Sequence, residues 1–362
     1  MMITARADFG GGPQHLFLLV KYLKDQLNIF IACPSDFPYM ERYKTLIGAE
    51  NICIIPHRKF KIKSLFELKG FILRKNIKLI HSHGKGAGIY GRFLSLLTGC
   101  PAVHTFHGLH IDNYNLVPRV FNLTVERFLS LFTRKFVCVS KSEYNRVIAA
   151  KITSASKVAV INNGVEINQE TVDEKLLDKE VKKILHVSRF DFAKNSLLLA
   201  AVIEALKEKK KYFKFIIIGS GEEEQEFKNR IIKKNLESYV EMKGKAEGLQ
   251  NYLRESFCLI STSRWEGLPL SVMEAMSCGV PVVAANVPGN NDLVEHNQTG
   301  FLFDIQKPDE AAGYISLLME NSDLWKKFSL SSVEKIKKNF TAAGMAKETE
   351  NLYLEIFKQH YK

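Results

Sequence analysis

Short apolar runs alternate with longer amphipathic segments along the whole chain. In the first half, strand-like runs occupy seven segments, 1–5, 28–32, 52–55, 78–81, 102–105, 135–139 and 158–161. In the second half, the same kind of run recurs in five segments, 184–187, 213–218, 240–242, 258–261 and 282–285. The segments between them have helical spacing. Alternating strands and helices predict an α/β protein with a parallel sheet and right-handed crossovers in each half.

The two sheets are predicted to belong to separate domains. Residues 166–181 are polar and charged without an apolar period, so we expect a linker between an N-terminal domain (1–165) and a C-terminal domain (182–344). Residues 345–362 are predicted to form a C-terminal helix that is long enough to cross back over the linker. A chain of 362 residues can hold two substantial cores.

Composition excludes several classes of protein. No apolar run reaches the roughly 18 residues of a membrane span, and the N-terminus lacks the pattern of a signal peptide. The six cysteines form no C-x-x-C pair and mostly lie in apolar contexts, which indicates reduced thiols and a cytoplasmic setting. We therefore expect a protein that does not cross a membrane.

The positive charge is concentrated in the first half. Residues 1–180 carry 25 Lys and Arg against 15 Asp and Glu, whereas residues 181–362 carry 26 against 24. The basic residues are not interleaved with aromatic residues in a nucleic-acid-binding motif, so no nucleic-acid partner is expected. Cations alternate with Phe, Ile and Leu over residues 57–78. That segment is either a surface for anionic lipids or an ordinary amphipathic helix packed on the sheet.

Polar residues and glycines follow several of the predicted strands. They are Gly10 to Gly12, His107, Arg189, Lys194, Gly219, Glu266 and Pro288. Open α/β sheets bind ligands at the edge where their strands end, and two such domains facing each other make a cleft. The glycines at 10–12 lack the G-x-G-x-x-G spacing, which leaves either a phosphate contact or a tight turn.

Five histidines fall in one window, at positions 81, 83, 104, 107 and 110. Their spacing fits no zinc template and no carboxylate joins them, so no metal is expected. His81 and His104 are predicted to be satisfied within strands. His107 follows a strand and precedes a glycine, where an imidazole can donate a hydrogen bond to a sugar hydroxyl or to a leaving-group oxygen.

Residues 264–281 predict a strand, a loop and a helix with one glutamate in the loop and one in the helix. Pro269 suits the first turn of the helix, and Gly279 with Pro281 ends it. The free N–H groups at the helix start would attract an anion, and Glu266 and Glu274 could accept hydroxyl donors on either side of it. A phosphate flanked by polyols is a sugar nucleotide. The alternative is a βα unit with two solvated glutamates.

Several motifs together resemble a known family. They are GGGPQH at 10–15, HTFHG at 104–108, VSKSE at 139–143, NNGV at 162–165, SRFDFAKN at 188–195, IIGSGEE at 217–223, EGLPLSVMEAMSCGVPVV at 266–283 and TGFLF at 299–303. With them the chain resembles the retaining glycosyltransferases of family 4, also called group 1. The resemblance implies the GT-B fold, two Rossmann-like domains facing across a cleft with a C-terminal helix that returns to the first domain.

The resemblance also implies roles for particular residues. His107 and Glu266 would act near the transferred sugar as catalytic residues. Substrate-binding residues would be Gly11 and Gly12 near the donor diphosphate, Arg189 and Lys194 on it, Glu274 on the ribose, the backbone of Met242 and Lys243 near the base, and Gly219 and Leu270 at neighbouring strand and helix ends. The chain departs from the family at Asn195, where glycine is usual, which affects the local turn.

The implied reaction moves a hexose or N-acetylhexosamine from a UDP-sugar to a hydroxyl of a saccharide acceptor, with retained configuration. The expected acceptor is linked to polyprenyl diphosphate in cell-surface polysaccharide or glycan synthesis, which would place the protein on the inner face of the cell membrane. The chain contains no Asp-x-Asp, so no metal cofactor is expected. Two alternatives are a sugar-nucleotide 2-epimerase of similar fold and a catalytically silent sugar-nucleotide-binding protein.

Overall fold

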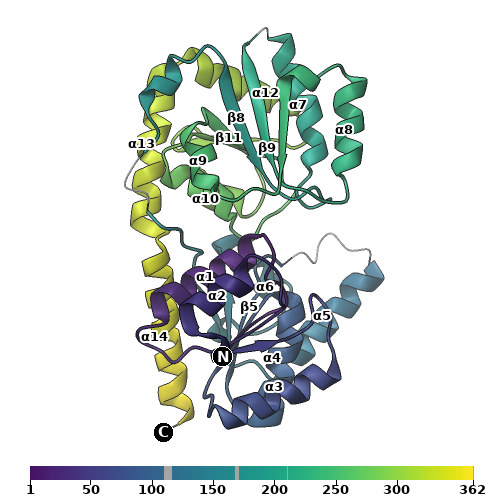
Figure 1. The fold of residues 1–362 in the computed structure, drawn as a ribbon, viewed down its shortest axis with the longest axis vertical. Helices are drawn as coiled ribbons and strands as arrows, with labels where there is room; N and C mark the ends of the chain where they lie inside the picture. The colour runs from purple at the N-terminus through teal and green to yellow at the C-terminus, as the bar shows by residue number, and fades with distance from the viewer. Residues whose placement is uncertain (110–115, 168–170, 210, 362) are drawn as a thin grey trace. The chain divides into compact units, whose positions relative to one another are not determined.

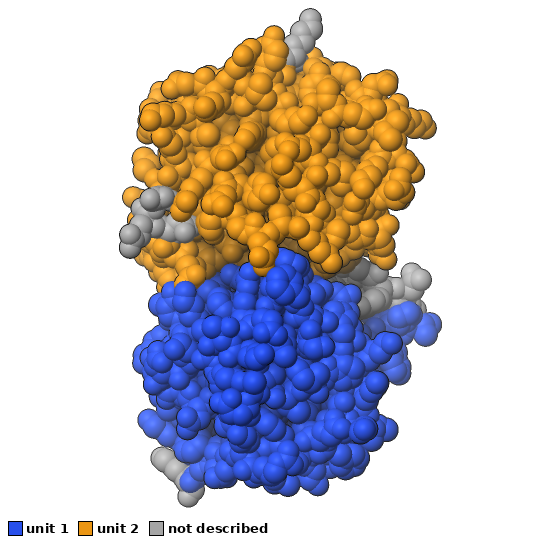
Figure 2. Space-filling model, in the orientation of Figure 1, with its two compact units in different colours: residues 1–164, 342–362 blue, residues 165–341 orange. Residues whose placement is uncertain are grey.

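The chain forms two compact units. The computed structural model describes residues 1–109, 116–167, 171–209 and 211–361, so His110 and residues 168–170 of the expected linker lie outside the described residues. Unit 1 comprises residues 1–164 and 342–362, and unit 2 comprises residues 165–341 (Figures 1 and 2). The C-terminal segment thus belongs to the first unit, and it starts at Ala342, three residues before the predicted position.

Unit 1 contains a seven-stranded sheet in the order β3-β2-β1-β4-β5-β6-β7, with parallel neighbours throughout. Its strands are β1 (Met2–Thr4), β2 (Ile31–Cys33), β3 (Ile52–Ile54), β4 (Ile80–His83), β5 (Ala102–Thr105), β6 (Lys135–Cys138) and β7 (Val158–Val160). Its helices are α1 (Gly11–Leu23), α2 (Tyr39–Ile47), α3 (Ile62–Arg74), α4 (Gly84–Thr98), α5 (Leu116–Ser130), α6 (Lys141–Ala149) and α14 (Ala342–His360).

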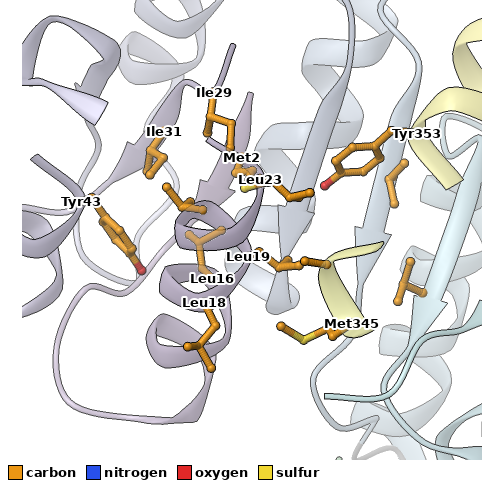
Figure 3. Packing of buried hydrophobic residues seen from close by; sticks show 14 of the residues in the cluster. Met2, Leu16, Leu18, Leu19, Leu23, Ile29, Ile31, Tyr43, Met345 and Tyr353 are labelled. Carbon is orange, nitrogen blue, oxygen red and sulfur yellow. The ribbon is translucent and has the colours of Figure 1, made fainter. Parts of the chain in front are cut away.

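The C-terminal helix α14 is part of the core of unit 1. Met345, Leu352, Tyr353 and Ile356 are buried in one cluster with side chains of α1, β1 and β2 (Figure 3). The Tyr353 hydroxyl also makes a hydrogen bond to Nδ1 of His81 in β4. Burying these side chains gives the last helix a fixed place on the unit that the chain left 178 residues earlier, at Gly164.

Within the basic segment, helix α3 packs one side on unit 1 and exposes Ile62, Phe66 and Leu73 on the other. Its Leu65, Leu68, Phe71 and Ile72 are buried in a cluster with α4 and β1. The lysines of the segment lie on the solvent side, as an ordinary amphipathic helix requires.

Unit 2 contains a six-stranded parallel sheet in the order β10-β9-β8-β11-β12-β13. Its strands are β8 (Lys182–Val187), β9 (Phe213–Ile218), β10 (Val240–Gly244), β11 (Cys258–Ser261), β12 (Val282–Ala285) and β13 (Gly300–Phe303). Its helices are α7 (Leu199–Glu208), α8 (Glu224–Lys233), α9 (Leu249–Arg254), α10 (Leu270–Ser277), α11 (Asn290–Leu293), α12 (Pro308–Glu320) and α13 (Ser322–Asn339). Strand β13 was not predicted by the sequence analysis, in which its residues occur only within the motif TGFLF.

The expected linker, residues 166–181, belongs to unit 2 where the structure describes it. Val172 is buried and its N–H donates to the Cys278 carbonyl oxygen at 2.8 Å. Asp173 caps a short 3-10 helix, Glu174–Leu177, by accepting from the N–H of Lys175. Most described residues of the segment are exposed, which explains its polar composition. Backbone hydrogen bonds also hold the segment on unit 2, and composition does not reveal such bonds.

The structure gives the starts of three helices near candidate site residues. Helix α1 begins at Gly11, so Gly11 and Gly12 lie in its first turn. Helix α4 begins at Gly84, directly after β4. Pro269 is the residue before α10 and keeps an extended backbone, so Leu270 is the first helical residue. Pattern alone sets helix ends poorly, since the first turn needs no apolar residue.

Among the helices of the described residues, none has both the length and the apolar character that crossing a membrane would require.

Candidate active site

In each sheet, the strand order reverses at one point. Because the strands are parallel, the loops that follow their carboxyl ends lie at the same edge of the sheet, and some of them lie beside this point. In unit 1 the order reverses between β1 and β4, and in unit 2 between β8 and β11. Ligands of open α/β sheets bind outside the carboxyl ends of the strands at such a reversal. The loops at these ends are 5–10 after β1, 106–109 after β5, 188–195 after β8 and 262–269 after β11.

Lys194 and Glu266 form an ion pair between two of these loops. Lys194 Nζ lies 2.6 Å from Oε1 and 2.8 Å from Oε2 of Glu266. The Ser263 hydroxyl donates to the same Oε1 at 2.7 Å, and the Glu266 N–H donates to the Pro288 carbonyl oxygen at 3.0 Å. Both charged side chains are largely buried. The pair holds a carboxylate and an ammonium group together at the end of β11.

Arg189 is held in the loop after β8 by a carboxylate of the same loop. Its Nε donates to Oδ2 of Asp191 at 2.7 Å, and Asp191 Oδ1 accepts from the N–H of Lys194 at 3.1 Å. The guanidinium remains partly exposed, so it keeps donors for an incoming anion. The predicted Arg189 and Lys194 therefore lie on one loop, oriented by one aspartate.

A buried histidine that the sequence analysis did not select supports this loop from below. His186 is the second last residue of β8, and its ring nitrogens contact the Ile260 carbonyl oxygen at 3.0 Å and the Ser188 hydroxyl at 2.8 Å. Burial lowers the pKa of His186 to about 4, so the ring is neutral. A single polar residue within an apolar strand is the signal in the sequence that could have found it.

Asn195, at the position where the family usually has glycine, lies in the left-handed region with a φ of 53° and a ψ of 37°. Asparagine tolerates this region better than most residues with a side chain. Its Nδ2 also donates to the Thr262 carbonyl oxygen at 3.2 Å, which joins this turn to the loop after β11.

Gly219 allows the ends of β8 and β9 to approach closely. Its φ is 138°, and a Cβ at this position would lie 1.7 Å from the Ser188 carbonyl oxygen. The Gly219 N–H donates to the Gly244 carbonyl oxygen at 2.7 Å, at the end of β10. Glycine is required here because the backbone of the loop after β8 fills the space of a side chain.

The predicted contacts to a base lie two strands away from β8. Met242 and Lys243 belong to β10, whose register on β9 shifts between Met242 and Gly244. The Lys243 side chain forms an ion pair with Glu241 on the same strand. The pairing of β10 with β9 therefore fixes the backbone of Met242 and Lys243, the part of this segment that was predicted to lie near the base.

Glu274 lies on the second turn of α10, whose N-terminus follows the loop after β11. Burial raises the pKa of Glu274 to about 7, and the nearby Glu166 carboxylate adds to this increase. Leu270, Ser271 and Val272 supply the first backbone N–H groups of the helix. A carboxyl poised to titrate near neutral pH and a set of helix donors thus lie on one short helix.

In unit 1, the loop after β1 is ordered by its own side chains. Arg6 donates from Nε to Asp8 at 2.7 Å and from one terminal nitrogen to the Phe9 carbonyl oxygen at 2.9 Å. A Cβ at Gly12, in the first turn of α1, would meet no atom of the described residues within 4 Å. The protein's own packing therefore does not require glycine at this position, and the space beside it is open.

Three histidines from different elements come together in unit 1. His83 ends β4, His107 follows β5, and His15 lies on α1, outside the window that the sequence analysis considered. His83 Nδ1 lies 3.2 Å from His107 Nε2, and one nitrogen of each ring lies within 4.8 Å of the others. Burial lowers the pKa of His15 to about 4 and that of His107 well below its usual range. The three rings are therefore neutral at pH 7.

His81 and His104 are satisfied within the sheet, as predicted. His81 contacts the Thr105 hydroxyl at 2.8 Å in addition to Tyr353, and Nδ1 of His104 contacts the Ser82 hydroxyl at 3.0 Å. Two described histidines at the sheet edge are therefore His83, the last residue of β4, and His107, in the loop after β5.

Glu143 positions the loop that carries His107. Ser140, in the motif VSKSE, caps the start of α6, since Ser140 Oγ accepts from the Glu143 N–H at 3.1 Å. The Glu143 carboxylate does not return to that cap but accepts from the N–H groups of Val139, at 2.8 Å, and Gly108. Burial raises its pKa to about 7. His107 itself has a φ of 60°, a conformation that such a contact to the next residue helps to hold.

Among the residues of unit 1 that the structure describes, two groups of side chains have the proximity needed to hold a metal ion. One is the set of His15, His83 and His107, and the other is Asp8, Asp36 and His57. The first offers nitrogen ligands of the kind that zinc accepts, and the second is partly exposed and mainly offers oxygen. Neither group was predicted, because its members come from segments far apart in the chain.

The fold and these loops define the class of protein. HepE of Anabaena, in crystal structures with UDP and glucose, superposes with a TM-score of 0.84 over 98% of this chain and 100% of that chain, at 20% identity. With two parallel Rossmann-like sheets, the chain has the GT-B fold.

Sequence comparisons identify the family. The model "Glycosyltransferase Family 4" matches residues 9–169 and the model "Glycosyl transferases group 1" matches residues 168–335. The chain therefore belongs to the group 1, or family 4, glycosyltransferases and is a glycosyltransferase. It is 27% identical over 358 residues to the Escherichia coli UDP-Gal:alpha-D-GlcNAc-diphosphoundecaprenol alpha-1,3-galactosyltransferase, covering 92% of this chain and 90% of the relative. It is 28% identical over 316 residues to the O-antigen biosynthesis glycosyltransferase WbnH of Escherichia coli, covering 86% and 87%.

Proposed function

We propose that the protein transfers a hexose or N-acetylhexosamine from a UDP-sugar to a hydroxyl of a lipid-linked saccharide, with retention of the anomeric configuration. The observation that carries this proposal is the arrangement at the β8–β11 reversal. Arg189 and Lys194 lie on one loop, the Glu266 carboxylate contacts the Lys194 ammonium, and Glu274 follows on α10. These are donors for a diphosphate and acceptors for the hydroxyls on either side of it.

The relatives support the choice of donor and acceptor. The galactosyltransferase from Escherichia coli is named for a UDP-sugar donor and a diphosphoundecaprenol-linked acceptor. Structures of HepE contain UDP, and one contains UDP-glucose. On this basis we propose a role in cell-surface polysaccharide synthesis at the inner face of the cell membrane.

The proposed step breaks the bond between the anomeric carbon and the phosphate oxygen and forms the new glycosidic bond on the same face. The acceptor hydroxyl gives its proton to the departing diphosphate oxygen. Arg189 and Lys194 stabilise the charge that the diphosphate gathers, and each such contact contributes about 1.5–3 kcal/mol. Glu266 orients Lys194 and accepts from a sugar hydroxyl. For His107 of unit 1, whose ring is neutral, the family resemblance supports the role of contacting the sugar.

Binding of the donor is tested by thermal unfolding with a panel of UDP-sugars and with the same sugars linked to GDP. We expect one or more UDP-sugars to raise the melting temperature, with UDP alone giving a smaller increase and GDP-sugars none. Stabilisation by GDP-sugars alone would contradict the choice of nucleotide.

The stereochemical course is tested by NMR of the first product formed from the donor that protects best. The anomeric proton of that product should show the configuration of the donor. Inversion would refute the proposed step, and epimerised UDP-sugar formed without an acceptor would indicate the epimerase instead.

A further inference from the structure

Helix α5 of unit 1 exposes a continuous apolar stripe. Val117, Val120, Phe121 and Phe128, with Leu131 directly after the helix, are between 53% and 78% exposed. Their spacing of three, four and seven residues places them on one side of the helix. Soluble proteins rarely leave so many large apolar side chains together in water without a partner.

The opposite side of α5 is fixed to unit 1, so the stripe has a defined orientation. Glu126 forms an ion pair with the fully buried Arg92 of α4 at 2.8 Å. Leu129 is buried, and Leu123 packs against the cluster around Phe136. Figure 1 shows α5 at the margin of unit 1. The only acidic side chain of the helix, Glu126, is thus turned away from the stripe.

A pocket lined by three arginines lies between α5 and α6. It measures about 240 Å³, and its lining consists of Arg119, Leu123 and Arg127 from α5, Arg146, Ala149 and Ala150 from α6, and Leu109. Arg127 is held by the Ala150 and Lys151 carbonyl oxygens, at 2.9 and 3.1 Å, at the end of α6. Guanidinium groups beside apolar side chains match the phosphate and the first acyl carbons of a lipid.

The charge of unit 1 favours a negatively charged partner. This unit contains 26 Lys and Arg against 12 Asp and Glu, whereas unit 2 contains 25 against 27. A second copy of the chain is a poorer partner for the stripe, because a two-fold contact would bring the same arginines face to face. A bilayer with anionic lipids satisfies the apolar stripe and the arginines together.

We propose that α5 is the membrane-docking surface of the protein, with its apolar stripe inserted among anionic phospholipids and a lipid phosphate in the three-arginine pocket. The inference builds on the proposed function, in which the acceptor is carried by a membrane lipid. It assigns the docking to α5, where the apolar stripe and the three-arginine pocket lie on the same helix. Helix α3 of the basic segment 57–78 also exposes Ile62, Phe66 and Leu73, so it is the competing surface.

Flotation of the full chain with vesicles tests the proposal. The vesicles contain phosphatidylcholine alone or phosphatidylcholine with phosphatidylglycerol. We expect binding to the anionic vesicles only, weakened by salt. Phe121→Ser with Phe128→Ser should reduce binding at least about tenfold. Arg119→Gln with Arg127→Gln should reduce it by roughly 30-fold, since each cation near an anionic surface contributes about 1 kcal/mol.

Matched controls come from unit 2. Leu330→Ser with Ile232→Ser removes two side chains that are 67% and 59% exposed, and Lys233→Gln with Lys337→Gln removes two exposed cations. Both control proteins should bind anionic vesicles like the unchanged chain. On α3, Phe66→Ser with Leu73→Ser removes exposed apolar side chains of the competing surface and should have little effect.

Four results would overturn the proposal. The unchanged chain could fail to bind vesicles, or the α5 variants and the unit 2 variants could lose vesicle binding equally. The α3 variant could lose vesicle binding while the α5 variants keep it. Finally, sedimentation could show a dimer that only the α5 variants disrupt. Thermal protection by UDP-glucose is measured on every variant. Because α5 belongs to unit 1, the fold of each α5 variant is checked by denaturant unfolding followed by circular dichroism, which should match that of the unchanged chain.

The same two measurements separate this inference from the proposed function. Vesicle binding through α5 without protection by any UDP-sugar would refute the proposed donor and leave the docking surface standing. Protection by a UDP-sugar without vesicle binding would refute the docking surface and leave the proposed donor standing.

Discussion

Glu266 and Lys194 are 72 residues apart in the chain, and their contact gives each of them a role that spacing could not predict. The sequence assigned Lys194 to the phosphates and Glu266 to the sugar as separate residues. In the structure one contact joins them, with Ser263 as a third partner. The carboxylate therefore orients the ammonium group in addition to any contact with the sugar.

Alanine at the two glutamates should separate binding from turnover. Glu274→Ala should weaken the binding of UDP-glucose and of UDP alike by about 10- to 100-fold, because the ribose hydroxyls lose their hydrogen bonds to a charged acceptor. Glu266→Ala leaves the cations Arg189 and Lys194 in place for UDP but removes the carboxylate that contacts the sugar and orients Lys194, so UDP affinity should be largely kept while kcat falls about 100-fold or more. Calorimetry with UDP and initial rates measure the two effects. Equal losses of UDP affinity in both variants would contradict this division.

The raised pKa of Glu274 predicts a pH dependence of donor binding. With a pKa of about 7, the carboxyl is mostly protonated in mildly acidic solution and ionised above neutrality. Ribose hydroxyls bind the ionised form better, so UDP-glucose affinity should increase as the pH rises through 7. UDP-glucose is used because its diphosphate stays fully ionised in this range. Glu274→Gln should remove the dependence, and an equally steep curve in that variant would assign it to another group.

At the scale of single elements, the loop after β8 shows how far sequence patterns reach. The strands predicted both the loop and its position at the sheet edge, and Asn195 lies in the left-handed region at the position where glycine is usual. The sequence analysis did not select two contributors. His186 supports the loop from inside β8 by a contact to Ser188, and its only signal in the sequence is a histidine beside apolar strand residues. Glu143 reaches from α6 to the loop that carries His107, a contact 35 residues away in the chain that periodicity does not encode.

Helix α5 is a second case. Apolar residues occur on nearly every side of this segment in the sequence, so the pattern does not distinguish the buried side from the exposed one. The ion pair of Glu126 with Arg92 decides the orientation, and only the structure reveals it.

Gly219→Ala should damage both the element and the site. The new Cβ would lie 1.7 Å from the Ser188 carbonyl oxygen, so the loop after β8 must move. We expect a loss of about 1–3 kcal/mol in stability and at least about tenfold in UDP-glucose affinity. Thermal unfolding and calorimetry measure them. Gly313→Ala on α12 is the control, because its Cβ meets nothing within 4 Å of described residues and should stabilise by about 0.5–1 kcal/mol. A similar effect of both substitutions would refute the steric argument.

At the scale of the whole molecule, the proposed chemistry should need no metal ion. Arg189, Lys194 and the start of α10 supply positive charge for the diphosphate, so EDTA should leave the transfer rate unchanged. Arg189→Ala should lower the rate about tenfold or more, by the loss of one charged contact. Rates with and without EDTA, followed by Mg²⁺ or Mn²⁺, test this. A loss in EDTA that either ion restores would require a metal, for which the two side-chain groups in unit 1 would be the first candidates.

The return of the chain to unit 1 makes the stability of that unit depend on its last helix. The sequence predicted this return from length and helical pattern, but not which side chains α14 buries. Ile356 is fully buried on α14, whereas Leu354, two residues earlier, is 44% exposed. Ile356→Ala removes buried methyl groups and leaves a cavity, which should lower the free energy of unfolding by about 2–5 kcal/mol.

Leu354→Ala is the matched control for that substitution, since it removes a similar side chain from the solvent side of the same helix. It should change stability by less than about 0.5 kcal/mol. Denaturant unfolding followed by circular dichroism measures both variants, and UDP-glucose protection reports on unit 2 in each. Because Lys194, Glu266 and Glu274 all belong to unit 2, that protection should remain in the folded Ile356→Ala protein. Equal stability of the two variants would show that α14 does not pack as described.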